Sequence, residues 1–159
     1  MATSRASVVS SFTIIKGSLI NETYAAFQRW DLGRPKADNL ERIRANGALA
    51  LTSSNWSRDI SKVLNRRFDP TGRDRAVVEL AKAGCDREVW KPLLLWHMTR
   101  DEFLLRDFLA DWLYDRYVQG TYRIRTDDVV PYLQRLKKRR GVQVSGDWWE
   151  ATTSRVASG

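Results

Sequence analysis

Basic side chains at a regular spacing between residues 54 and 67 are the first feature of this chain that could do chemistry. Arg58, Lys62 and Arg66 stand at i, i+4 and i+8, and Arg67 follows directly. On a helix this interval places three cations on one face, where they repel one another. A nucleic-acid backbone neutralises such a stripe and releases counterions, so the spacing favours phosphate binding. Solvated charge on an ordinary helix face is the alternative.

The residues around this stripe and a second basic run extend the hypothesis. Ser54 and Asn55 open the predicted helix, where a hydroxyl, an amide and free backbone N–H groups can meet a phosphate or a base edge. This arrangement is typical of the recognition helix of a helix-turn-helix. The second basic run, at residues 137–140, lies at the end of another predicted helix. Cations in a last helical turn complement the helix dipole, but four in succession exceed that need. We therefore expect a second phosphate contact along the run Lys137, Lys138, Arg139 and Arg140.

Motifs for catalysis are missing. The sequence has no glycine-rich phosphate loop, no cysteine pair, and no HExxH or GxSxG motif. It contains a single histidine and a single cysteine, which excludes a histidine-rich metal site and an internal disulfide. Asp107, Asp111 and Asp115 share one helical face, but three carboxylates on a straight helix seldom close around an ion. We predict an exposed polar face there, and a protein that is not an enzyme and uses no metal, cofactor or small-molecule substrate.

Composition and charge fit a domain that meets a polyanion. The chain has 159 residues, 43% of them hydrophobic, and a formal net charge of +8. Residues 1–70 carry 11 basic and 6 acidic side chains, residues 71–120 carry 8 and 9, and residues 121–140 carry 7 and 2. A nearly neutral centre between two basic lobes suits a polyanion lying across one side. The apolar runs are far shorter than the roughly 20 residues that a bilayer requires. A secretory signal is also missing, so we expect a cytoplasmic protein with no membrane contact.

The elements that must position these residues read as helices. Apolar residues at three- and four-residue intervals predict an all-α bundle with helices over 18–32, 35–47, 54–68 and 71–84. Residues 86–119 predict a helical hairpin that carries most of the core, broken at a capping box over Thr99–Glu102. A further helix starts at Thr126 or Asp128 and ends in the second basic run. Alternating patterns allow short strands over 121–125 and 141–145.

The domain organisation follows from the same pattern. Residues 1–11 predict a flexible arm, and residues 12–159 a single helical domain. Its parts are basic helices over 12–69, core helices over 71–119 and a basic C-terminal part over 120–159, which looks cut within a larger fold. A last helix is predicted over Asp147–Ala157, and its Trp148 and Trp149 could stack on bases of a single strand.

Three segments together resemble one known family. The order and spacing of Ser11–Thr23, Leu51–Arg67 and Leu105–Leu109 are similar to those of the BrxA family of bacteriophage-exclusion (BREX) systems, over about residues 11–159. The resemblance implies a small, helical, non-catalytic component of an anti-phage defence island. It also implies a fold similar to the NusB antitermination proteins and an association with DNA.

The sequence therefore predicts a component that binds double-stranded DNA through phosphates with low sequence specificity. Other BREX proteins are expected as further partners. Two alternatives stay open. The likeness to NusB and the tryptophans allow an RNA-binding module. A protein scaffold could use the face of Asp107, Asp111 and Asp115, or the C-terminal part.

Overall fold

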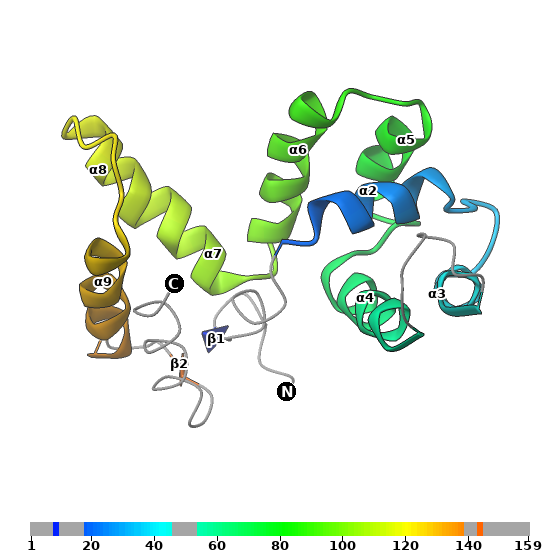
Figure 1. Cartoon of the computed structure of the whole chain (residues 1–159), viewed down its shortest axis with the longest axis horizontal. Coiled ribbons are helices and arrows are strands. Elements are labelled where there is room, and N and C mark those ends of the chain that lie inside the picture. Colours follow the sequence, from blue (N-terminus) through cyan, green and yellow to red (C-terminus); the bar gives the residue numbers. More distant parts are fainter. Residues whose placement is uncertain (1–7, 10–17, 46–53, 139–142, 145–159) are drawn as a thin grey trace. The chain divides into compact units, whose positions relative to one another are not determined.

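The computed structural model describes residues 8–9, 18–45, 54–138 and 143–144, and these residues fold as helices with one very short strand pair (Figure 1). The prediction of an all-α fold is confirmed. The chain divides into two compact units, with the boundary between Met98 and Thr99. We call residues 18–98 unit 18–98, and residues 99–144 together with residues 8–9 unit 99–144. The single domain predicted over 12–159 stays a prediction.

Unit 18–98 contains the helices α2 (Ile20–Gln28), α3 (Lys36–Ala45), α4 (Ser54–Arg67) and α5 (Arg75–Lys82), and nearly all of α6 (Arg87–Thr99). All five helices bury apolar side chains in one core, and this burial is the main favourable term in folding. The fully buried large apolar side chains are Phe27, Trp30, Ile60, Val63, Leu64, Val77, Val78, Trp90, Leu94 and Met98. The residue at the N-cap of α2 is Leu19, with φ 50°.

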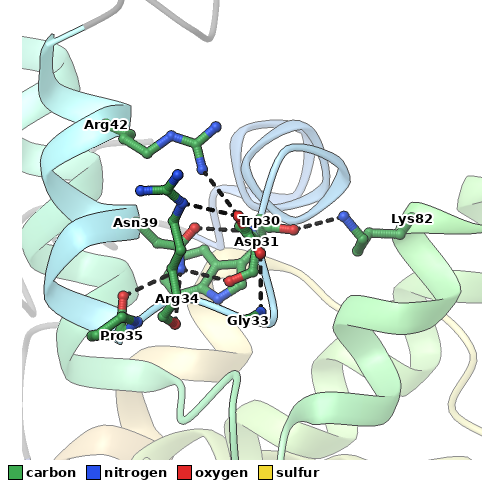
Figure 2. Close-up of polar contacts among 8 residues, drawn as sticks. All are labelled: Trp30, Asp31, Gly33, Arg34, Pro35, Asn39, Arg42 and Lys82. Carbon is green, nitrogen blue, oxygen red and sulfur yellow. Dashed lines mark hydrogen bonds and ion pairs between the residues drawn. The ribbon is translucent and has the colours of Figure 1, made fainter.

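Asn39 organises the turn between α2 and α3 (Figure 2). Its side chain is buried, accepts a hydrogen bond from Asp31 N at 2.8 Å and donates to Asp31 O at 2.9 Å. Lys82 on α5 donates to Trp30 O at 2.7 Å, which ties the same turn to a third helix. The backbone N–H of Gly33 and the guanidinium of Arg34 bind the Asp31 carboxylate and lower its pKa below the ordinary value. These polar contacts fix how α3 leaves α2.

Unit 99–144 is built on one continuous helix of three parts. The α-helix α7 (Phe103–Asp107) leads into the π-helix η2 (Phe108–Leu113) and then into the α-helix α8 (Tyr114–Val118). The chain returns as α9 (Thr126–Lys138), seen below α8 in Figure 1. Aromatic rings join η2 to α9. Within η2, Trp112 stacks on Phe108 with the ring centroids 5.0 Å apart, and Trp112 meets Tyr132 of α9 at 5.3 Å between centroids. The buried core of this unit is Leu104, Trp112, Tyr132, Leu133 and Leu136.

Residues 86–119 were predicted to form a single hairpin with most of the core. Instead the two helices belong to different units, and Trp90 on α6 packs against α2 and α5. The capping box is also wrong, because Thr99 ends α6 and Glu102 is the N-cap of α7, where it makes no side-chain cap hydrogen bond.

The two predicted strands have different outcomes. Residues 121–125 take no regular secondary structure, since an extended segment becomes a strand only where a neighbouring backbone pairs with it. The strand β2 (Gln143–Val144) lies within the second predicted range and pairs in parallel with β1 (Val8–Val9). Val8 and Val9 fall in the arm predicted to be flexible, so this part of the arm is paired. The rest of the arm and the helix predicted from Trp148 lie outside the described residues.

Gly120 ends α8 and sets the direction of the segment that follows. Its φ is +82°, and its N–H donates to Tyr117 O at 3.0 Å while Thr121 N donates to Arg116 O at 2.8 Å. A side chain strains this left-handed conformation. We expect Gly120→Ala to lower the free energy of unfolding by about 1 kcal/mol, measured by chemical denaturation. Gln119→Ala, at an ordinary φ of −78°, is the control, and equal stabilities of the two variants would contradict the argument.

Candidate nucleic-acid interface

Helix α4 carries the predicted contact residues and is held firmly by α3. Its buried face contributes Ile60, Val63 and Leu64 to the core. Arg44 on α3 donates to the hydroxyl of the buried Ser61 at 2.9 Å, and Lys36 donates to the carbonyls of Asn65 and Phe68 at 2.8 and 2.5 Å. The lysine thus satisfies carbonyl groups at the C-terminal end of α4 and complements its dipole. The outer face of α4 therefore sits on a fixed support.

Two cations of the predicted stripe stand free on that outer face. Arg58 and Lys62 are exposed, and among the described residues neither makes an ion pair or a hydrogen bond. Arg66, one turn further, is half-buried and engaged in contacts of its own. The structure thus brings the three residues onto one helix but leaves only the first two fully available to an anion.

Arg67 does not belong to this surface. It is 1% exposed, and its guanidinium donates to Ser18 O at 3.3 Å. A buried guanidinium reaches no phosphate unless the helix leaves its place in the core. The hydrogen bond to Ser18 O offsets part of the cost of burying the charge. Arg67 is therefore a structural residue, and its predicted contact with the DNA backbone is wrong.

The remaining predicted residues are only partly described. Ser54 and Asn55 form the first turn of α4, as expected, but their side chains lie outside the described part of the structure. In the second basic run, Lys138 is exposed at the end of α9, whereas the side chain of Lys137 and the whole of Arg139 and Arg140 lie outside it. The run belongs to unit 99–144 and the α4 stripe to unit 18–98.

Sequence reasoning missed Arg44. Arg44 is exposed, and its guanidinium donates a hydrogen bond to Ser61 on α4. A cation from α3 therefore adds to the positive charge of α4. The spacing along the chain carries no signal for this contact, since the two residues lie 17 positions apart on different helices. Trp56, in the first turn of α4, is 36% exposed.

Asp111 and Asp115 are exposed, as predicted for the polar face that they form with Asp107, but Asp107 is not. Asp107 is buried and accepts a hydrogen bond from the hydroxyl of Tyr132 at 2.9 Å. All three carboxylates line a pocket of about 360 Å³ together with Trp112, Tyr132, Arg135 and Leu136. Within the described ranges, no three histidine, cysteine, aspartate or glutamate side chains converge as ligands for a metal ion.

His97 is packed inside unit 18–98, where it contacts a buried carboxylate. Its Nδ1 lies 2.6 Å from the carboxylate of Asp74, and both side chains are buried. Asp74 also accepts a hydrogen bond from Asp69 N at 2.7 Å, just beyond the end of α4. The pair links α6 to the turn that follows α4, which is a structural task.

None of the helices described combines the length and the apolar character that crossing a bilayer requires.

Comparisons with known proteins give one result. The BrxA family model matches residues 11–159. Neither a search of curated proteins nor a search of solved structures gives a match, so the similarity to the NusB fold stays a prediction. The family match covers nearly the whole chain, including the α4 stripe and both described units. The chain therefore belongs to the BrxA family.

Proposed function

We propose that this protein is a non-catalytic component of a bacteriophage-exclusion system that acts in the cytoplasm and binds double-stranded DNA. Membership of the BrxA family implies the defence context. The observation that carries the DNA-binding proposal is the exposed pair Arg58 and Lys62, which stand one turn apart on a braced helix without an acidic partner among the described residues. Cations in this arrangement gain most when they neutralise phosphates.

The contact surface is assigned to α4 and its neighbour α3. Arg58 and Lys62 bind phosphates directly, Arg44 adds positive charge from α3, and Arg66 adds it at the inner edge of the stripe. The first turn of α4, with Ser54 and Asn55, meets the backbone or a base edge through its free N–H groups. Lys137, Lys138, Arg139 and Arg140 supply a further phosphate contact from unit 99–144. Other BREX proteins are its expected protein partners.

Low sequence specificity follows from the nature of these groups. Arginine and lysine facing phosphates position a protein on DNA but carry no information about bases. Asn55 and Arg58 are the two residues of the surface with the chemistry to read a base edge in the major groove. Discrimination between unrelated sequences is therefore expected to be small.

The test is a titration of two unrelated duplexes of about 20 base pairs, followed by fluorescence anisotropy at about 50 and about 200 mM salt. We expect both duplexes to bind with dissociation constants within about threefold of each other, and both to weaken strongly at the higher salt. The absence of duplex binding at the lower salt concentration would overturn the proposal. So would a competition in which single-stranded RNA of equal length displaces the duplex completely, which would favour the RNA-binding alternative.

A further inference from the structure

Three tyrosines crowd an exposed surface at the far end of unit 99–144. Tyr114, Tyr117 and Tyr122 are 61%, 62% and 75% exposed, although tyrosine rings are usually at least half covered. The first two lie at i and i+3 on α8, and the third comes from the segment that follows Gly120. We call these three residues the tyrosine surface. Val118 and Ile124 add apolar area beside it, at 65% and 40% exposed.

The backbone holds the tyrosine surface in place. The turn at Gly120 brings the segment 121–125 back toward α8, so that the rings of Tyr117 and Tyr122 meet edge to face, 5.5 Å apart at 73°. At the other end of the segment, Asp128 accepts a hydrogen bond from Arg125 N at 2.9 Å and anchors the start of α9. Aromatic side chains fixed in this way cost little entropy when a ligand binds them.

Positive charge accompanies the rings. Residues 114–125 contain Arg116, Arg123 and Arg125 against a single acidic residue, Asp115. Arg116 is engaged, with its guanidinium 4.6 Å from the ring centroid of Trp112 and 3.8 Å from the Asp128 carboxylate. Arg123 and Arg125 are exposed, and the described residues supply neither of them with an acidic partner. The surface therefore combines open aromatic faces with two available guanidinium groups.

We propose that this surface binds single-stranded DNA by stacking bases on the tyrosines while Arg123 and Arg125 neutralise phosphates. Base stacking on aromatic side chains tolerates any sequence, because every base has a π-face. A duplex does not satisfy the tyrosines, since its bases already stack on one another. An apolar protein partner would cover the rings but leave two guanidinium groups desolvated without a carboxylate. Charge and aromatic exposure together thus favour a single strand.

This proposal stands apart from duplex binding by α4, because it uses residues of the other unit. A strand opened within a bound DNA molecule would supply the ligand, but neither site requires the other. A variant that loses one activity and keeps the other is therefore expected for each surface. This independence keeps the two proposals separately testable.

The experiment compares the whole chain with Tyr117→Leu/Tyr122→Leu, which keeps apolar side chains but removes both rings. The probe is a fluorescent oligothymidylate of about 15 nucleotides. We expect the double variant to bind it at least about tenfold more weakly, and to bind duplex DNA within about twofold of the unaltered chain. Trp96→Leu is the matched control, since Trp96 is also 59% exposed but belongs to unit 18–98, and it should bind the oligonucleotide normally.

Two further measurements sharpen the test. An abasic strand of the same length should bind more weakly than oligothymidylate, because it keeps the phosphates and loses the stacking partners. Arg123→Gln/Arg125→Gln should reduce the salt dependence of oligothymidylate binding. Equal affinity of the tyrosine variant and the unaltered chain would overturn the proposal. Binding of oligouridylate without binding of oligothymidylate would also overturn it and make the occupant RNA, while no binding of either strand would favour a protein partner.

Discussion

Replacing Arg58 and Lys62 together with alanine is expected to weaken duplex binding roughly 100-fold at about 50 mM salt. Each phosphate contact contributes about 0.9 to the slope of log affinity against log salt. Loss of two contacts should therefore flatten the slope by about 1.8. The affinities of the variant and the unaltered chain then diverge progressively as salt is lowered from about 1 M. Both side chains are exposed on α4, so their removal leaves the core of unit 18–98 untouched. The measurement is the affinity of the double variant at several salt concentrations.

The matched control removes the same charge elsewhere in unit 18–98. Arg75 pairs with Glu79 at 2.7 Å, and Lys91 pairs with Glu88, so neither offers a free cation. Arg75→Ala/Lys91→Ala lowers the net charge equally and should change the affinity less than about threefold. If both double variants lose affinity and salt dependence to the same extent, net charge alone explains binding and the assignment to α4 fails. If neither loses affinity, the duplex contacts another part of the chain.

Adding Arg66→Ala to the double variant is expected to lower the affinity for duplex DNA less than either of the first two substitutions does. Arg66 is half-buried and has contacts within the protein, so its charge is less available to a phosphate. The difference between the exposed and the half-buried cation is a consequence of the fold that equal spacing along the helix does not reveal.

Arg67 was predicted to lie on the surface because of its charge, although its position in the apolar pattern of α4 indicates burial. Ile60, Val63, Leu64 and Arg67 stand at i, i+3, i+4 and i+7, which places the arginine on the buried stripe of α4. A charged residue at such a position is ordinarily assigned to the surface, because arginine is seldom fully buried. The contact with Ser18 O, 49 positions away, makes burial possible here, and such a distant partner has no local signal.

Asp107 shows the same effect in unit 99–144. It was placed on an exposed face by its charge, yet it lies three residues after the buried Leu104 and bonds to Tyr132 on α9. The π-helix over Phe108–Leu113 also has no signal in the apolar pattern, since a local widening of the helix depends on how its rings pack. Long periodic helices such as α4 and α9 could be predicted, because their own sequence carries the pattern.

The division into two units could not be predicted from periodicity either. The apolar residues before and after Thr99 continue with similar spacing, so they read as one hairpin with a shared core. Which core each helix joins depends on partners far along the chain: Tyr24 and Phe27 for α6, but Leu133 and Leu136 for α7 and η2. The candidate DNA surface could be proposed from the sequence because its residues lie on one helix, whereas the tyrosine surface needed the turn at Gly120 to bring Tyr117 and Tyr122 together.

Trp90→Ala is expected to lower the free energy of unfolding of unit 18–98 by about 3–5 kcal/mol. Trp90 is 0% exposed, and its Nε1 donates to Val77 O at 2.9 Å. Its ring meets Tyr24 and Phe27 edge to face at 5.0 and 6.3 Å, so one side chain joins α6 to α2 and α5. Alanine would leave a large cavity among these helices. Trp90→Phe keeps most of the ring and should cost only about 1–2 kcal/mol, chiefly through the lost hydrogen bond.

Trp96→Ala provides the contrast, because Trp96 lies on the same helix but is 59% exposed. Its substitution should cost less than about 1 kcal/mol, and chemical denaturation followed by far-UV circular dichroism measures all three variants. Equal losses for Trp90→Ala and Trp96→Ala would show that the buried ring does not hold this unit together. At a temperature where Trp90→Ala is still folded, its affinity for duplex DNA should match the unaltered chain, because the core supports α4 without touching the ligand. A folded Trp90→Ala variant that fails to bind would contradict this expectation and mean that duplex binding depends on the packing of α6 as well as on the outer face of α4.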